Sequence, residues 1–149
     1  MEDPRPLMQQ ALKDAMKNKD NFRRDVVRLM QSAIKQVEVD TRREPTAEEV
    51  VDILQKEAKK RRESIEELTQ AGREESAENE RNELLIIEEF LPRQLSEEEL
   101  TAIVREVIAE TGVSSPKDMG RVMGPVMARV KGLADGNAVN KIVRQELSS

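Results

Sequence analysis

The chain has 149 residues, 37% of them charged, and a formal net charge of −5. It contains no cysteine and no histidine, which excludes disulfides, thiolate metal sites and the commonest general base. It has two Phe and no Trp or Tyr, which excludes a protein that binds nucleic acid by stacking bases on several aromatic rings. Any contact with nucleic acid is therefore expected to be with phosphate and sugar.

The first 92 residues show apolar side chains at helical spacing, with no sustained alternation of the kind that strands require. This spacing predicts helices over about 6–19, 21–40, 47–71 and 74–90. Between the second and third of these, Pro45 disfavours helix at Glu44, and Thr46 with Glu49 forms a capping box. We therefore expect an N-terminal domain, residues 1–92, that is a multi-helix array.

A basic run, Lys59 to Arg62, lies in the middle of the predicted helix over 47–71. Four consecutive residues point in different directions around a helix, so they cannot all face one partner. One interpretation is a solvated face with i,i+4 pairs such as Lys59–Glu63 and Arg62–Glu66. The other is a patch that binds a partner, and the pattern favours the first.

The last third of the chain predicts three more helices. Ser96 with Glu99 is a capping box that opens a helix over about 97–111, which Gly112 ends. Ser115 is a good N-cap for a second helix that ends at about 131, with a kink or short break near 121–125 where Pro125 clashes with a preceding carbonyl. Asp135 caps a third helix over about 136–147. The whole chain is thus predicted to be all-α, with a three-helix C-terminal domain over 95–149.

This C-terminal part also differs from the rest in charge and glycine content. Residues 111–149 carry six basic and three acidic side chains, so the remainder of the chain carries −8. The six basic residues are candidates for phosphate contact: Lys117, Arg121, Arg129, Lys131, Lys141 and Arg144. Gly120 and Gly124 are four residues apart, so they share a helix face on which another backbone could approach closely.

The run from Asp118 to Val143, DMGRVMGPVMARVKGLADGNAVNKIV, resembles the C-terminal signature of the YqeY family. The same small helical module forms the tail of GatB, one of the proteins that make up the aspartyl/glutamyl-tRNA amidotransferase. AMKNKD at 15–20, AGR at 71–73 and FLPRQLSEEEL at 90–100 also fit a YqeY-like protein, so the resemblance covers nearly the whole chain. The matching signature residues include Gly120, Gly124, Gly132, Asp135, Gly136 and Asn140. Pro125 and Leu133 depart from the family pattern, which places a helix-compatible and a basic residue at these positions.

The resemblance implies a tRNA-associated binding module, because in the amidotransferase relatives the tail lies next to the substrate tRNA while catalysis belongs to other domains. The family is commonly described as having carbon–nitrogen ligase activity with glutamine as the amido-N donor. We expect no such activity from this chain alone, since no activated nucleophile beside a base is visible. Ser114 to Lys117 brings serine and lysine together, but a helix cap explains that segment, and core packing explains the methionines at 119, 123 and 127.

We accordingly expect no catalytic residue, no metal and no cofactor. The alternative to tRNA binding is a protein–protein adaptor whose acidic helical body docks another protein without touching RNA. The N-terminus has neither a basic start nor an apolar run, and no apolar stretch approaches membrane-spanning length, which favours a cytoplasmic protein.

Overall fold

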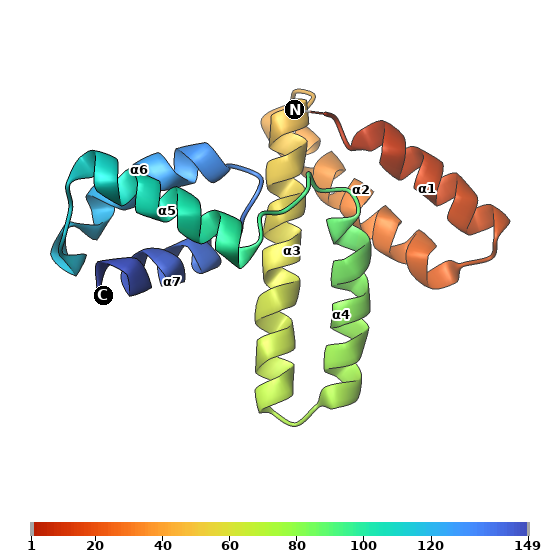
Figure 1. The fold of residues 1–149 in the computed structure, drawn as a ribbon. Coiled ribbons are helices and arrows are strands. Elements are labelled where there is room, and N and C mark those ends of the chain that lie inside the picture. The colour runs from red at the N-terminus through yellow and green to blue at the C-terminus, as the bar shows by residue number, and fades with distance from the viewer. Residues whose placement is uncertain (1, 149) are drawn as a thin grey trace. The chain divides into compact units, whose positions relative to one another are not determined.

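The computed structural model describes residues 2–148, and every regular element among them is helical, as predicted (Figure 1). Seven α-helices and one 3₁₀ turn follow each other along these described residues. They are α1 (Arg5–Lys17), α2 (Asn21–Thr41), α3 (Ala47–Gln70), α4 (Glu74–Glu88), α5 (Glu97–Thr111), η1 (Pro116–Asp118), α6 (Met119–Val130) and α7 (Gly136–Leu147). The contacts divide them into two compact units, one ending at Pro92 and the other beginning at Arg93.

Capping side chains set the helix boundaries in the first unit. The Thr46 hydroxyl accepts a hydrogen bond from the Glu49 amide, while the Glu49 carboxylate accepts one from the Thr46 amide, which is the predicted capping box. Asp20 caps α2 in the same way by accepting from the Arg23 amide. These local hydrogen bonds explain why the predicted and observed starts of α2 and α3 agree to within a residue.

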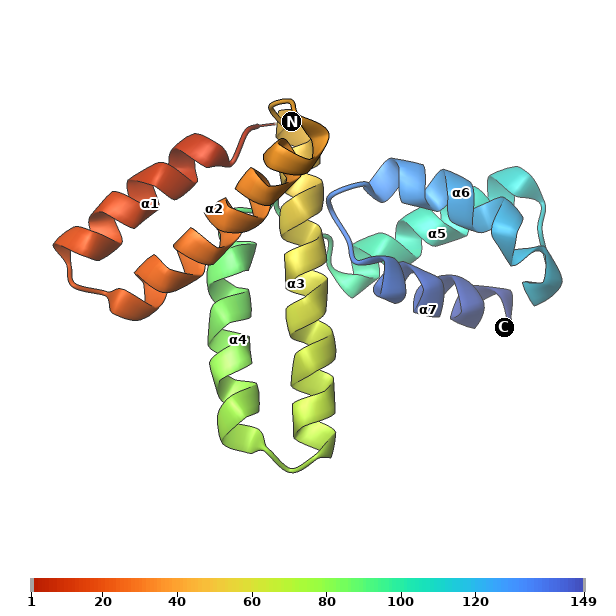
Figure 2. The same ribbon diagram turned by 180° about the vertical axis from the view of Figure 1, so that it is seen from behind.

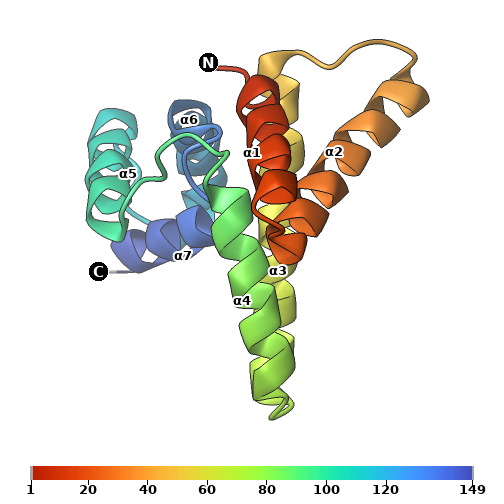
Figure 3. The same cartoon turned by 90° about the vertical axis from the view of Figure 1, so that its right-hand side faces the viewer.

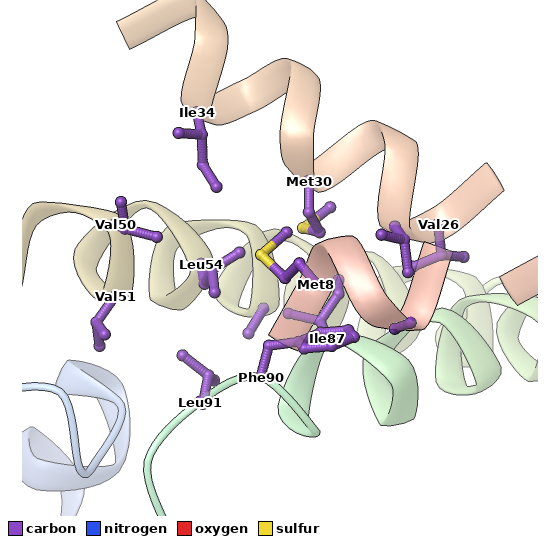
Figure 4. Packing of buried hydrophobic residues seen from close by; sticks show 13 residues of the cluster. Met8, Val26, Met30, Ile34, Val50, Val51, Leu54, Ile87, Phe90 and Leu91 are labelled. Carbon is purple, nitrogen blue, oxygen red and sulfur yellow. The ribbon is translucent and has the colours of Figure 1, made fainter. Parts of the chain in front are cut away.

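One apolar cluster joins the four helices of the first unit (Figure 4). Met8 of α1, Met30 of α2, Leu54 of α3 and Ile87 of α4 are each fully buried and meet in it. These helices contribute few aromatic rings to the cluster, and flexible methionine side chains fill the irregular gaps between them. Phe90 closes the end of the cluster, and the Arg23 guanidinium lies 5.9 Å from the centre of its ring.

Away from this cluster, α3 and α4 form a hairpin whose far end extends past α1 and α2 (Figures 1 and 3). Charged groups hold the two helices together there. Arg61 of α3 lies 3.7 Å from Glu57 in its own helix, and 3.8 and 3.2 Å from Glu80 and Glu83 of α4. Arg62 lies 3.9 Å from Glu88 of α4.

These contacts bear on the two interpretations of the basic run. Lys60 also pairs with Glu57, at 3.1 Å, so three of the four cations neutralise carboxylates of the chain itself. The carboxylates belong partly to α4, rather than to the next turn of α3 as the i,i+4 interpretation assumed. The run therefore serves mainly to pair α3 with α4.

The second unit is built on a cluster of small aliphatic side chains from α5, α6 and α7. Val104, Val122, Val126 and Val139 are fully buried in it. The Ser96 hydroxyl caps α5 by accepting from the Glu99 amide, and Gly112 ends α5 with a φ of 69°. Helix α6 runs antiparallel to both α5 and α7, as opposite views show (Figures 1 and 2).

Two details of α6 differ from the prediction. Ser115 does cap the segment, accepting from the Lys117 amide, but the residues that follow form a 3₁₀ turn before the α-helix begins at Met119. Helix α6 then continues through Pro125, so of the predicted kink or short break the break is absent. Pro125 is exposed, so its ring lies on the solvent side of the helix while the valines on the other side pack continuously into the core.

Candidate nucleic-acid interface

The seam between α6 and α7 brings most of the signature residues together. A Cβ added to Gly136, at the start of α7, would lie 3.9 Å from the Cε atom of Met127, near the end of α6. Because the two helices are antiparallel, each further turn of α7 comes level with an earlier turn of α6 (Figure 2). By this spacing Asn140 is expected to come level with the turn of Met123 and Gly124, and Arg144 with the turn of Met119 and Gly120.

Within the second unit, Gly120 and Gly124 do not make the close contact with another backbone that their spacing indicated. A Cβ added to either residue would meet no atom within 4 Å apart from its chain neighbours and the backbone of its own helix, and both residues are exposed. Neither glycine has the positive φ that would demand glycine. The chain therefore exposes a stretch of bare helix backbone here, with room for an approaching group.

Four of the six candidate cations are exposed and have no partner among residues 2–148. These are Lys117 in η1, Arg121 in the first turn of α6, and Lys141 and Arg144 on α7. No carboxylate of the described chain lies within ion-pairing distance of their side chains, which leaves the positive charge of each available to another molecule.

Arg129 is different, because it is already paired. Its guanidinium lies 2.5 Å from Glu110 and 3.7 Å from Glu106, both on α5. These contacts tie α6 to α5 and neutralise the charge, so Arg129 is a poor candidate for phosphate contact. The signal in the sequence is that Glu106 and Glu110 are four residues apart and so present two carboxylates on one face of α5. Lys131, the remaining candidate, is exposed at the end of α6.

The other signature residues shape the loop that joins α6 to α7. Gly132 has a φ of 77°, a conformation that side chains rarely adopt, and its carbonyl accepts a hydrogen bond from the Gln94 side chain at 3.0 Å. The Leu95 amide donates to the Leu133 carbonyl at 2.8 Å. Asp135 then caps α7 by accepting from the Asn137 amide at 3.4 Å. Gly132 and Asp135 thus have structural roles, in the loop and at the start of α7, as their positions in the sequence predicted.

Met127 is the residue of this surface that sequence reasoning missed. Its spacing places it in the apolar stripe of α6, yet 36% of it is exposed, beside Gly136. The apolar stripe of α6 is wider than the part of the helix that the core covers, and Met127 lies at the edge of that stripe. The exposure of Met127 gives the seam one apolar contact among polar and charged groups.

The described residues also bear on a metal site and on a membrane span. Within the part of the chain that the structure describes, no set of three or more acidic side chains is grouped to hold a metal ion. No helix among these residues is long and apolar enough to cross a bilayer. What the second unit provides is exposed backbone flanked by four cations, a surface that suits an anionic chain.

The fold and this surface define an all-helical protein of two units, the second of which carries a glycine-rich, cationic helix seam. Residues 5–147 match the family described as Yqey-like protein, and the chain belongs to that family. The match confirms the resemblance over nearly the whole chain.

Relatives of two kinds were found. "Altered inheritance of mitochondria protein 41, mitochondrial" of Kluyveromyces lactis is 34% identical over 124 residues, which cover 80% of this chain and 66% of that protein. The protein of the same name from Pyrenophora tritici-repentis is 28% identical over 94% of this chain and 78% of its own length. One component of the glutamyl-tRNA(Gln) amidotransferase of Methanospirillum hungatei is 41% identical over 59 residues, 37% of this chain and 10% of that component.

The names of the fungal relatives place those proteins in mitochondria. The expectation of a cytoplasmic protein is therefore not confirmed by the comparisons.

Proposed function

We propose that this protein is a tRNA-associated binding module that contacts RNA phosphates through the seam between α6 and α7. The observation that carries the proposal is the set of four exposed, unpaired cations on one small unit: Lys117, Arg121, Lys141 and Arg144. Lysine and arginine without an internal carboxylate partner are the groups that displace counterions from a nucleic acid backbone.

The glycines support the proposal independently of the charges. Glycine in the middle of a helix costs roughly 0.5–1 kcal/mol relative to alanine, and nothing inside the unit requires the small size of Gly120 or Gly124. A ligand that lies against the helix backbone would require it. The sugar–phosphate backbone of RNA is such a ligand, since its contacts with protein are made at short range to oxygen atoms.

The comparison with the amidotransferase component supports RNA over other polyanions. The name of that protein specifies glutamyl-tRNA(Gln), and a segment of 59 residues is shared at 41% identity. The shared segment is one tenth of that protein, so the amidotransferase activity itself is not transferred to this chain. The proposal is accordingly restricted to association with tRNA, with any carbon–nitrogen ligase chemistry belonging to other proteins.

The test is to titrate labelled tRNA with wild-type protein and two double charge reversals, Lys117→Glu/Arg121→Glu and Lys141→Glu/Arg144→Glu. We expect each double variant to weaken binding by at least about tenfold at low salt, because two phosphate contacts are lost and two repulsions added. Lys56→Glu/Lys59→Glu is the matched control, because it reverses two exposed charges on α3 that have no ion pair among the described residues. Equal affinity for all four proteins would contradict the proposal.

A protein–protein adaptor without RNA contact is the second candidate. The acidic excess favours it, because all of the net charge of −5 belongs to residues 1–92 and repels RNA at long range. Capture of partners from cell extract with and without ribonuclease separates the two candidates. Partners that survive ribonuclease treatment, together with no binding of purified tRNA, would establish the adaptor.

A further inference from the structure

The first unit has a groove of its own between α1 and α2. Its volume is about 440 Å³. The floor is apolar and consists of Met8 and Leu12 from α1 and Ile34 from α2. Gln9 of α1 and Gln31 of α2 also line it, and neither side chain has a hydrogen-bond partner among residues 2–148. The groove thus combines an apolar floor with unused amide groups at the rim.

Toward the turn that joins α1 to α2, this surface continues in Met16, whose side chain is 53% exposed. The Arg28 guanidinium of α2 lies 3.9 Å from the sulfur of Met16, so the two helices remain in contact there. Met16 is four residues after Leu12, so it extends the apolar stripe of α1 by one turn. The apolar surface is therefore longer than the groove alone.

The electrostatics of this surface differ between its two ends. Near the turn, Lys13 and Arg28 are exposed and have no carboxylate within ion-pairing distance among the described residues. At the other end, Arg5 pairs with Asp3 at 2.6 Å and with Glu44 at 3.3 Å, and Lys35 pairs with Glu38 at 3.5 Å. The charged residues that line the groove itself are therefore paired, whereas Lys13 and Arg28 near the turn have no carboxylate partner among the described residues.

We propose that this groove binds an amphipathic helix of a partner protein, with acidic residues in the turn that lies over Lys13 and Arg28. A helix that places apolar residues at i, i+3, i+4 and i+7 would cover Leu12, Ile34 and the exposed part of Met16. Lys13 and Arg28 favour one direction of that helix, because the charged residues that line the groove toward its other end, Arg5, Lys35 and Glu38, are already paired. The proposal concerns the first unit and is independent of RNA binding by the second.

The test uses ¹⁵N-labelled full-length protein and synthetic 16-residue amphipathic peptides, each with four leucines on one face and three glutamates in the terminal turn. Three leucine registers are compared, and a matched set carries lysine in place of each glutamate. We expect at least one glutamate peptide to bind and to shift the amide signals of Gln9, Leu12 and Gln31. We expect the lysine version to bind at least about tenfold more weakly.

Two variants locate the site without disturbing the core. Lys13→Glu/Arg28→Glu reverses the free cations, and Met16→Glu places a charge on the exposed apolar residue; each should weaken the glutamate peptide by about tenfold or more. Lys56→Glu/Lys59→Glu on α3 is the matched control and should leave its affinity unchanged. Circular dichroism verifies that each variant keeps its helices.

Several results would overturn the proposal. They are no binding by any of the glutamate peptides, equal binding of the lysine versions, or affinities that Lys13→Glu/Arg28→Glu leaves unchanged. A short unstructured RNA that shifts the same amides while the peptides do not would show that the face takes a polyanion instead. A dimer in light scattering that Met16→Glu abolishes would show that a second copy of the chain occupies the groove.

Discussion

Gly120 and Gly124 occupy positions in α6 where alanine is the better helix former. Each lies at an exposed point with no atom within 4 Å of the place a Cβ would take. We expect Gly120→Ala and Gly124→Ala each to raise the free energy of unfolding by up to about 1 kcal/mol. Thermal and urea unfolding measure this directly.

The same substitutions distinguish the effect of these glycines on stability from their effect on tRNA binding. If a tRNA backbone lies against the glycines, the added methyl groups weaken tRNA binding even though they stabilise the helix. Ala128→Gly is the matched control, because it makes the reverse change at another exposed position of α6 and should destabilise the helix. A loss of stability in Gly120→Ala would mean that the glycine is required by the fold.

Glu49 is the residue whose ionisation the fold changes most clearly. The Arg43 guanidinium donates two hydrogen bonds of 2.8 Å to its carboxylate, and the Thr46 amide donates another. These bonds lower the pKa of Glu49 from 4.5 to about 2. A lowered pKa means that the ionised carboxylate stabilises the folded state above about pH 4.5, and that this contribution is lost as the pH falls toward 2.

We therefore expect the stability difference between wild type and Glu49→Gln to be largest near pH 6, to be small at pH 2 and to disappear below it. Urea unfolding of both proteins at a series of pH values measures this difference, and acid effects common to both cancel. Because Glu49 is exposed to solvent, the difference should also shrink at high salt. A difference that stays constant from pH 6 to pH 2 would show that the bonds to Arg43 do not hold in solution.

Among the elements, the α3–α4 hairpin is held by charges as well as by apolar contacts. The Arg61 side chain is only 15% exposed and lies among Glu57, Glu80 and Glu83. Burial and the nearby charge of Glu83 raise the pKa of Glu80, which shows that the carboxylates repel each other even with Arg61 present. Removing the guanidinium leaves these carboxylates close together without a counter-charge.

We expect Arg61→Met to destabilise the protein by about 3 kcal/mol, the range seen when one partner of a largely buried ion pair is removed. Glu80→Gln/Glu83→Gln in the same background should recover much of the loss. Arg81→Met, which breaks more exposed pairs with Glu74 and Glu78 at the hairpin end, is the control and should cost less than about 1 kcal/mol. Equal losses for Arg61→Met and Arg81→Met would contradict this explanation of the hairpin.

The elements also show which features the sequence could predict. Helix starts at Thr46 and Ser96 were predictable because the capping side chain and its amide partner lie within four residues. The continuity of α6 through Pro125 was not, because it depends on which side of the helix faces the core. The basic candidates were all visible in the sequence, but only the fold shows that Arg129 is neutralised by α5.

Over the complete chain, the two units differ in charge. Residues 1–92 carry 17 basic and 22 acidic side chains, whereas residues 93–149 carry eight of each. The acidic side chains of the second unit concentrate on α5, where Arg93 and Arg129 pair with them, and Arg105 of α5 pairs with Glu146 of α7. This internal pairing leaves the cations beside the α6–α7 seam free, although the unit has no net charge.

The salt dependence of tRNA binding is the sharpest test of the proposed interface, because it counts the phosphates that the protein neutralises. Four contacts predict that the logarithm of the association constant falls with the logarithm of salt concentration with a slope of about −2.8 to −3.6. Lys141→Glu/Arg144→Glu should reduce the magnitude of the slope by roughly 1.5 to 2, and Lys56→Glu/Lys59→Glu should leave it unchanged. No binding by wild type at low salt, or a slope that the seam variant leaves unaltered, would contradict the assignment of tRNA to this surface.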